Sequence, residues 1–425
     1  MKRRGSSKAW VFLFLAAIFA VALPFGLAQT KTTVTYWTHV NPPSQAIEKK
    51  LIERYLKDNP NVEIEYAPVD FVSLPTKLTT AFAGGGGPDI FNYFQSYAPA
   101  LVQRGFLASV DFKAFGGSLE SFKTQYQPAV VNGYSFGGNV YGIPHEVSSF
   151  AFWVNGAHFK EVGLDAVKNY PKTWVDVTRI GKKLTNANRE GIVMPLYNPV
   201  RDMLIFDTLA RQAGGGLFSD DGKTARLNSA SAVKALKTWG DMIHVSKIND
   251  PKLGPTASTD SLDLFGNGTA AMNPAGGSWF TSILEQQYPN VYKNYVVGQY
   301  PIMAGGPAIG ADLYGFGLFV AKTSKNQTET WKFARFLADN GDDYFTEASL
   351  WLGDLKTLNS SATKDFPHWD VFKTAFSRGF FLPPLTNYNE LTQIIERAIQ
   401  RVVLSGQSAK DSLEQAQTEA VPLMK

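Results

Sequence analysis

Residues 74–90 read LPTKLTTAFAGGGGPDI, and this stretch decides the fold class. Its apolar residues recur at the spacing that places side chains on one face of a helix. They are Leu74, Leu78, Ala81 and Phe82. Four glycines at 84–87 end that helix, and Pro88-Asp89-Ile90 then enters a short strand. A helix that passes directly into a strand is typical of α/β proteins.

The residues before this stretch show the same alternation. Residues 33–37 predict a strand, and Ser44 is placed to cap a helix that Asn59-Pro60 ends. Residues 62–66 alternate as a second strand. Strands and helices that alternate at this spacing predict parallel sheets covered by helices.

Helical signals continue through the second half of the chain. Thr173 and Asp176 form a capping box, Gly406 ends a long helix, and Ser408 with Asp411 caps another. Two apolar stripes at helical spacing support this prediction. They are Val233, Leu236, Trp239, Ile243 and Leu391, Ile394, Ile395, Ala398, Ile399, Val402. A chain of 425 residues exceeds the usual size of one core, so we expect two domains.

The first 28 residues have the composition of a signal peptide. Four basic residues precede an apolar run at 9–23, and Gly26-Leu27-Ala28 supplies small residues before a cleavage site. We expect cleavage between Ala28 and Gln29. The chain has 41 Lys plus Arg and 37 Asp plus Glu, and the leader holds four of the basic and none of the acidic residues. The remainder, with 37 of each sign, is formally neutral, which gives a nucleic-acid partner no support.

The chain contains no cysteine. Disulfides, thiolate metal sites and cysteine nucleophiles are therefore excluded, and so is a lipid-bearing cysteine that would tether an exported protein. We expect a periplasmic protein that is monomeric, is not a lipoprotein, and uses neither a cofactor nor a metal.

The familiar catalytic motifs are incomplete. Gly222-Lys223-Thr224 resembles the end of a P-loop, but Leu217 stands where that motif needs glycine. Gly276-Gly277-Ser278 lacks the last glycine of a nucleophile elbow, and His145-Glu146 has no second histidine at zincin spacing. A glycosidase pair assembled from distant carboxylates stays open, with Asp202 and Glu146 as the pair to examine. The hypothesis that the chain is an enzyme is the less favoured one.

Aromatic and polar residues are interleaved in loops where strands are expected to end. The strand-end residues of this kind are Trp37, His39, Asn41, Tyr93, Gln95, Ser96 and Trp279, and two further aromatics beside glycines are Tyr314 and Trp351. Open α/β sheets bind ligands at the carboxyl ends of their strands. A sugar offers a C–H face to an aromatic ring and hydroxyls to polar side chains. The pattern therefore favours a sugar site.

The order of these segments resembles the bacterial extracellular solute-binding proteins of sugar ABC transporters, the maltose-binding-protein-like family 1. The resemblance covers essentially the whole chain after the leader. Its most specific part is Phe265-Gly-Asn-Gly-Thr-Ala-Ala-Met272, which leads to Trp279. The other matching segments are 33–37, 77–90, 101–110, 141–144, 155–164, 171–174 and 405–408.

This resemblance implies a periplasmic-binding-protein-like fold of two α/β lobes joined by hinge crossovers, with a ligand cleft between them. The implied crossovers lie near 145–150, 299–308 and 346–354. The implied division is a signal peptide at 1–28, an N-terminal lobe at 29–145 plus 305–348, and a C-terminal lobe at 146–304 plus 349–425. The implied function is the substrate-binding component of an ABC importer, which closes on a mono- or oligosaccharide and delivers it to a permease in the inner membrane.

The resemblance also implies a set of ligand-contacting residues. These are His39, Asn41, Tyr93, Gln95, Ser96, Glu146, Asp202 and Trp279. The chain departs from maltose-type members at Ser96-Tyr97, where they carry acidic and basic residues, and at Trp153-Val154-Asn155 in place of Tyr-Asn. Glycerol phosphate or another small polar solute is the alternative ligand. An anion would need cations at the site, and Arg201 is the one obvious candidate in the implied loops.

Overall fold

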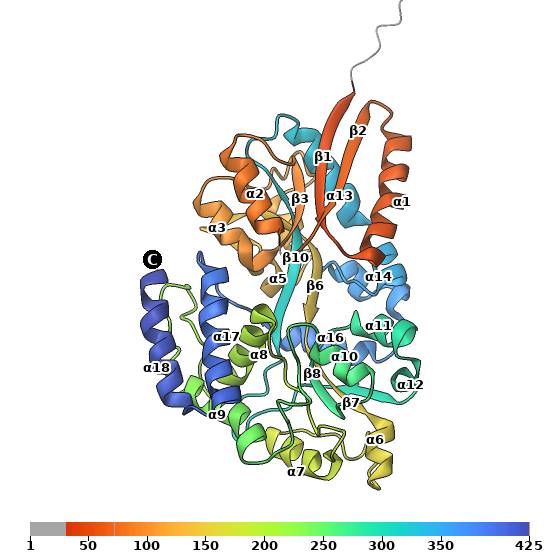
Figure 1. The fold of residues 1–425 in the computed structure, drawn as a ribbon. Coiled ribbons are helices and arrows are strands. Elements are labelled where there is room, and N and C mark those ends of the chain that lie inside the picture. The colour runs from red at the N-terminus through yellow and green to blue at the C-terminus, as the bar shows by residue number, and fades with distance from the viewer. Residues whose placement is uncertain (1–30, 72, 425) are drawn as a thin grey trace, which may run out of the picture.

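The computed structural model describes residues 31–71 and 73–424. Figure 1 shows two α/β lobes, one above the other, with β6 (Gly142–Ser149) and β10 (Asp312–Val320) running between them. The two-lobe α/β fold expected from the sequence is confirmed. The predicted leader and its cleavage site lie outside the described residues.

The upper lobe is built on a mixed six-stranded sheet in the order β11-β10-β3-β1-β2, with β6 paired to β10. Parallel pairing joins β1 (Thr32–His39) to β2 (Val62–Val69) and β3 (Ile90–Phe94), and β10 to β11 (Phe380–Phe381). A small hairpin adds β4 (Ser135–Phe136) and β5 (Asn139–Val140). Within the described residues, five α-helices come before β6 in the chain: α1 (Pro42–Asp58), α2 (Leu74–Ala83), α3 (Ala98–Gln103), α4 (Leu119–Lys123) and α5 (Pro128–Gly133). Four more lie in the chain between β10 and β11: α13 (Gln327–Asp339), α14 (Gly341–Ala348), α15 (Leu355–Leu358) and α16 (Trp369–Arg378).

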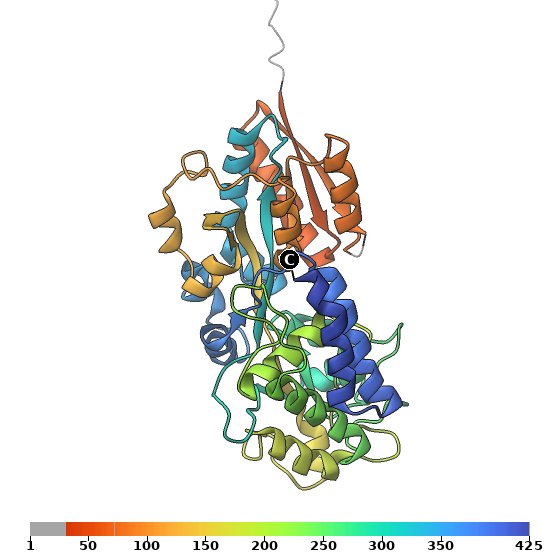
Figure 2. The ribbon, with the colours of Figure 1, turned by 90° about the vertical axis from the view of Figure 1, so that its left-hand side faces the viewer.

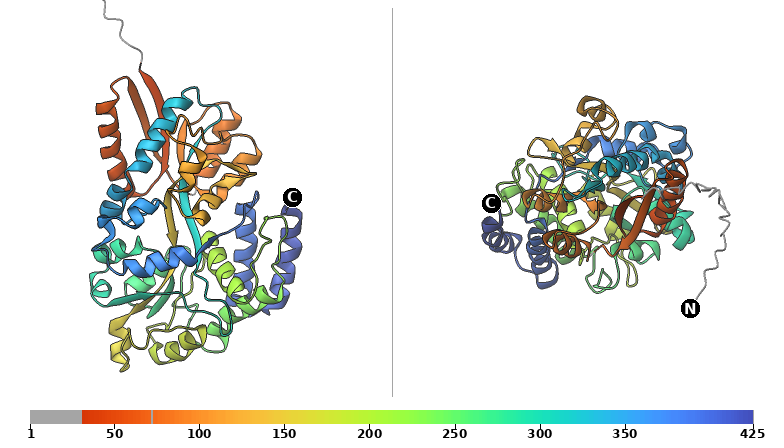
Figure 3. Two further views of the ribbon diagram at one scale, coloured as in Figure 1. Left: turned by 180° about the vertical axis from the view of Figure 1, so that it is seen from behind. Right: turned by 90° about the horizontal axis from the view of Figure 1, so that it is seen from above.

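The lower lobe has a three-stranded sheet in the order β8-β7-β9. Its strands are β7 (Ala151–Asn155), β8 (Met272–Gly276) and β9 (Tyr295–Gly298), and β7 pairs antiparallel with both neighbours. Figures 2 and 3 show α17 (Tyr388–Ser405) and α18 (Ala409–Ala420) side by side on this lobe. Its other helices are α6 (Gly156–Glu161), α7 (Trp174–Leu184), α8 (Pro199–Gln212), α9 (Ala230–His244), α10 (Ser261–Gly266), α11 (Phe280–Gln287) and α12 (Pro289–Tyr292).

The prediction of parallel sheets is correct for β1, β2 and β3 but wrong for the lower lobe and for the crossover strands. β10 pairs antiparallel with β3 and β6 because β10 carries the chain back from the lower lobe to the upper one. Helix-strand alternation indicates layers of helices on a sheet, but it does not fix the direction of strands that connect two lobes.

Most helix boundaries follow the expected local chemistry. The capping box of Thr173 and Asp176 is present, Gly406 ends α17 with a φ of 71°, and Ser408 caps α18. The cap predicted at Ser44 is wrong, because α1 begins at Pro42 and Asn41 occupies the N-cap position. Proline fixes φ near the helical value and lacks the amide that would go unpaired in the first turn, so it starts a helix well.

Buried apolar residues form two main clusters. One contains the upper sheet and its helices, together with residues 350–376, and it extends to Trp153 and Phe280 below. The other contains α7, α8, α9, α17 and α18. The lobe limits given by the resemblance stay a prediction. None of the helices in the described part of the chain has the length and apolar content that crossing a membrane requires.

Candidate functional site

Several strands end or cross at the junction between the lobes. β1 and β3 run parallel and bring their carboxyl ends there, while β6 and β10 pass through it. β7 starts directly after β6, and β8 runs antiparallel to it with Gly276 opposite Ala151, so the residues that follow β8 return to the same place. We call the residues gathered here the junction cluster. They are His39, Asn92, Phe94, His145, Glu146, Gly277, Trp279, Tyr314 and Phe316.

Aromatic rings form one part of this cluster. The imidazole of His39 stacks on Phe316 with ring centroids 4.0 Å apart and planes 14° apart. Phe94 lies opposite Phe316 in the strand register, with centroids 5.5 Å apart, and Phe71 lies 5.8 Å from Phe316. Phe71 and Phe316 stay partly exposed, so an aromatic surface is open at the junction.

Trp279 and Tyr314 form a second aromatic pair, in this case hydrogen-bonded. The indole Nε1 of Trp279 donates to the Tyr314 hydroxyl over 2.7 Å. Tyr314 also packs on Phe150 at 4.7 Å. Gly277 makes room for the pair, because a Cβ there would collide with Ser148 Oγ and lie 2.7 Å from Trp279 Nε1. Trp279 keeps part of its surface exposed at the N-cap of α11.

A relay of buried polar groups forms the third part. His39 Nδ1 lies 3.0 Å from Asn92 Oδ1, and Asn92 Nδ2 lies 2.7 Å from His145 Nδ1. Burial lowers the pKa of His39 to about 4, and burial together with the charge of His39 lowers the pKa of His145 to about 3. Both rings are therefore neutral at neutral pH.

Two buried carboxyls, Glu146 and Asp202, were predicted to contact the ligand. Burial raises the pKa of Glu146 to about 7, and Glu146 lies opposite Phe316 in the register. Asp202 lies in the first turn of α8 with no exposed surface, and burial raises its pKa further than the charge of Glu396 does. A carboxyl with no exposed surface does not face a ligand directly, so the pair does not form an open acid–base site in this arrangement.

The one obvious cation of the implied loops is already paired. Arg201 Nη1 lies 2.6 Å from one carboxylate oxygen of Asp260 and 2.5 Å from the other. Both side chains are partly buried. This ion pair leaves the Arg201 guanidinium without an excess charge to offer an anion.

Other predicted residues lie away from the junction cluster. Trp37 lies inside β1 opposite Phe91, and Tyr93 lies on the other face of β3 from Asn92 and Phe94. Trp351 is 1% exposed, donates from Nε1 to the Asp354 carbonyl, and packs on Phe376.

The remaining predicted residues lie near strand or helix ends. Asn41 is the N-cap residue of α1 and makes no side-chain cap bond. Gln95 and Ser96 follow β3, are buried, and bond to one another over 2.9 Å. Asn41, Gln95 and Ser96 lie close to junction-cluster residues in the sequence. Within the described residues, however, their side chains make no hydrogen bond to the cluster.

Sequence reasoning missed Asn92, His145 and Phe316. Asn92 lies within an apolar strand, and the histidine next to Glu146 depends on an irregularity where β6 pairs with β10. Phe316 lies between Gly315 and Gly317, and this alternation of glycine and a large ring was an available signal. A Cβ on either glycine would clash with the Glu146 backbone or with Tyr134.

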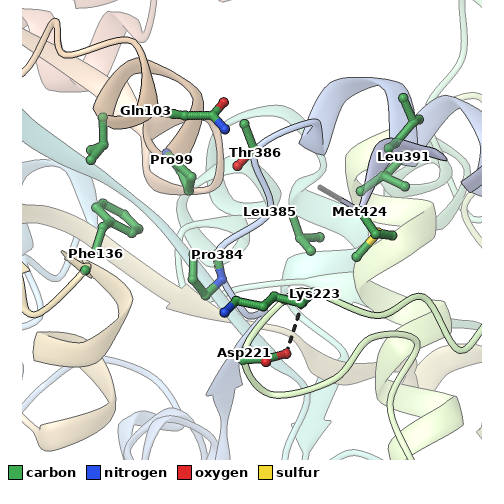
Figure 4. A pocket seen from close by; sticks show the side chains of 14 residues that line it. Pro99, Gln103, Phe136, Asp221, Lys223, Pro384, Leu385, Thr386, Leu391 and Met424 are labelled. Atoms are coloured by element: carbon green, nitrogen blue, oxygen red, sulfur yellow. Dashed lines mark hydrogen bonds between the residues drawn. The ribbon is translucent and has the colours of Figure 1, made fainter. Parts of the chain in front are cut away.

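A cavity of about 270 Å³ lies apart from this cluster. Figure 4 shows that its labelled walls come from α3, Phe136, the turn at Asp221 and Lys223, residues 384–386 before α17, Leu391 of α17, and Met424. It shares no lining residue with the junction cluster. We place the candidate site at the cluster, because buried polar groups and open aromatic rings meet there.

Comparison with known proteins identifies the family to which the chain is similar. The profile of the family described as bacterial extracellular solute-binding protein matches residues 40–343. A maltotriose-binding protein of Pyrococcus abyssi is 22% identical over 381 residues, which cover 87% of this chain and 77% of that protein.

Solved structures share the fold. The GacH receptor of Streptomyces glaucescens, solved unliganded and with acarbose, superposes with a TM-score of 0.80 at 20% identity, over 93% of this chain and 98% of that one. A solute-binding protein of Thermotoga lettingae bound with α-D-tagatose gives a TM-score of 0.79 at 21% identity, over 93% and 100%.

Proposed function

This chain belongs to the family of bacterial extracellular solute-binding proteins, and from that premise we propose that it is the substrate-binding component of an ABC importer for an uncharged mono- or oligosaccharide. The observation that carries the choice of ligand is the hydrogen-bonded pair of Trp279 and Tyr314 beside the polar relay. Aromatic rings suit the C–H face of a sugar, and neighbouring polar groups suit its hydroxyls.

The charge state of the junction supports an uncharged ligand. His39 and His145 are neutral because burial lowers their pKa values to about 4 and 3. Arg201 is neutralised by Asp260. A phosphate is bound well by an unpaired cation, and the cluster supplies none among the described residues. Glycoside hydrolysis would need two accessible carboxyls, whereas Asp202 is wholly buried.

A thermal-shift screen tests this function. The panel contains maltotriose, acarbose, tagatose, ribitol and glycerol 3-phosphate, each at millimolar concentration. A ligand that binds only the folded state raises apparent stability by RT ln(1 + [L]/Kd), about 2.7 kcal/mol at 100 Kd. We expect a neutral sugar to raise the melting temperature and glycerol 3-phosphate to leave it unchanged. The reverse result contradicts the uncharged ligand, and release of product sugars during incubation contradicts passive binding.

The location in the cell is part of the same proposal. We expect export to the periplasm, cleavage after Ala28, no attached lipid, and delivery of the sugar by a monomer to permease subunits in the inner membrane. The leader composition and the lack of cysteine support this expectation. Intact-mass spectrometry of the exported protein should give a chain that begins at Gln29. An acylated or uncleaved chain contradicts it.

A further inference from the structure

We infer that His39 presents the lone pair of its Nε2 to the ligand, as an acceptor for a sugar hydroxyl, and that Asn92 is the positioning residue that fixes this tautomer. The role toward the ligand rests on the proposed function. The tautomer itself is a property of the ligand-free chain and is tested separately.

The carboxamide of Asn92 determines where both imidazole protons lie. Its Oδ1 only accepts, so the Nδ1 of His39, 3.0 Å away, must carry the proton. Its Nδ2 only donates, so the Nδ1 of His145, 2.7 Å away, must offer a lone pair. In a neutral imidazole one nitrogen donates and the other accepts. His39 therefore has a lone pair on Nε2, and His145 has its proton on Nε2.

Burial and stacking hold the relay in one state. Asn92 is 1% exposed, His145 2% and His39 8%. Exchange of the two roles would need rotation of an amide enclosed by protein. The stack on Phe316 at 4.0 Å fixes the plane of the His39 ring, and the Tyr344 ring packs edge-to-face on His145 at 4.7 Å.

The two outer nitrogens differ in their surroundings. Nε2 of His145 is buried without a partner, so it is the closed end of the relay. Nε2 of His39 lies at the ring edge opposite the Asn92 contact, in a residue that keeps some exposure, and it has no bonding partner in residues 31–71 and 73–424. It is the end at which a ligand donor can bind.

The lone pair on Nε2 of His39 discriminates between classes of ligand. A neutral acceptor favours a hydroxyl, which donates, and repels the oxygens of a phosphate or carboxylate, which only accept. A ligand that lacks a hydroxyl which a buried site binds leaves the site atom unpaired. The resulting loss of binding free energy is far larger than that for a ligand lacking one methylene in an apolar pocket. His39 therefore acts as a specificity residue, and Asn92 acts through it.

Long-range ¹H–¹⁵N correlation spectra of the full-length, ligand-free chain at pH 7 test the tautomers. The chain has five histidines, and His39→Gln and His145→Gln variants assign their signals. We expect the Nδ1–H pattern for His39 and the Nε2–H pattern for His145. The opposite patterns, or a charged imidazolium at His39, overturn the inference.

The variant Asn92→Leu tests the positioning role. It keeps the branched shape and the number of side-chain heavy atoms but removes both amide contacts, so we expect the His39 signal to leave the pure Nδ1–H pattern. An unchanged pattern overturns the role of Asn92. The control Asn249→Leu removes a buried amide that bonds Glu190 in the lower lobe. It should lower stability without changing the His39 spectrum.

Titration calorimetry with maltotriose connects the tautomer to binding. We expect Asn92→Leu to weaken maltotriose about tenfold and Asn249→Leu to leave its affinity per folded molecule unchanged. Full affinity together with a changed tautomer overturns the hydroxyl contact. If the wild-type chain does not bind maltotriose, the choice of that sugar fails, while the spectra still decide the tautomer.

Discussion

Trp279 shows how a single residue connects the sequence to the proposed site. It ends the most specific part of the family resemblance, and the structure bonds its indole to Tyr314 at the junction. Trp37 and Trp351 satisfied the same reasoning, yet the first lies within β1 and the second is enclosed by Phe376 and Asp354. An aromatic residue beside glycine or at a strand end has the same local signature in a core and in a site. What separates them is the tertiary surroundings of each ring, which the local sequence does not determine.

The Trp279→Ala variant should weaken sugar binding by about 1–3 kcal/mol, because it removes both a stacking ring and the donor to Tyr314. Trp279→Phe keeps a ring and should lose less. Calorimetry with the sugar found in the thermal screen measures both. If Trp279→Ala lowers the melting temperature but leaves the affinity per folded molecule unchanged, Trp279 is a core residue.

Glu48 is a buried acid that the binding proposal does not use. Its two oxygens accept from the Tyr36 hydroxyl over 2.6 Å and from the Tyr66 hydroxyl over 2.7 Å. Burial raises its pKa from the ordinary 4.5 to about 7, against the lowering effect of these bonds. Between pH 4.5 and about 7, Glu48 is therefore mostly protonated in the folded chain and mostly ionised in the unfolded chain.

This shift predicts a pH dependence of stability. The contribution of Glu48 is fully present below pH 4.5 and is lost as the pH rises through 7, for a total of about 3 kcal/mol. Urea unfolding of the wild type and of Glu48→Gln from pH 5 to 8 measures it. The difference in free energy of unfolding between the two proteins should shift in favour of the variant as the pH rises. Glu146 and Glu190 are present in both proteins, so their contributions cancel in this difference. Parallel curves contradict the shift.

Hydrophobic period and capping chemistry predicted most of the helices and strands that the structure contains. The strands β1, β2 and β3 and the helices α2, α7, α9, α17 and α18 lie where their apolar stripes and caps indicated. The junction cluster could not be derived in the same way. It depends on the antiparallel register between β6 and β10 and on the irregularity beside Glu146, and both are tertiary choices that local spacing does not encode.

Glycine in β10 shows what that register requires. A Cβ at Gly315 would collide with the Glu146 carbonyl oxygen and lie 2.9 Å from the Tyr134 hydroxyl. We expect Gly315→Ala to destabilise the chain by about 1–3 kcal/mol, since the crossover strands would have to separate. Gly86→Ala is the matched control, because its nearest neighbour would be the Ala81 carbonyl at 3.9 Å. Urea unfolding of both variants checks the difference, and equal stability contradicts the close approach.

In the whole molecule, residues of the candidate site come from both lobes. His39, Asn92 and Phe94 belong to the upper sheet, whereas Trp279 follows β8 of the lower one. β6 and β10 carry the chain across and also contribute Glu146, Tyr314 and Phe316. The family resemblance predicted two lobes with crossovers. It could not give the relay, because that relay is formed by residues of three different strands of this chain.

We predict that the two lobes close on the ligand. A sugar that touches His39 above and Trp279 below stabilises the closed form only through contacts that the open form lacks, so its differential affinity sets the shift in population. Moving the equilibrium from 1:99 to 99:1 takes about 5.5 kcal/mol. Several hydrogen bonds at about 1 kcal/mol each, together with one stacked ring, are of that order. Small-angle X-ray scattering should give a smaller radius of gyration at saturation with the sugar than without it. An unchanged radius at saturation proven by calorimetry contradicts closure, because the two halves of the site must then already be in their bound arrangement before the sugar arrives.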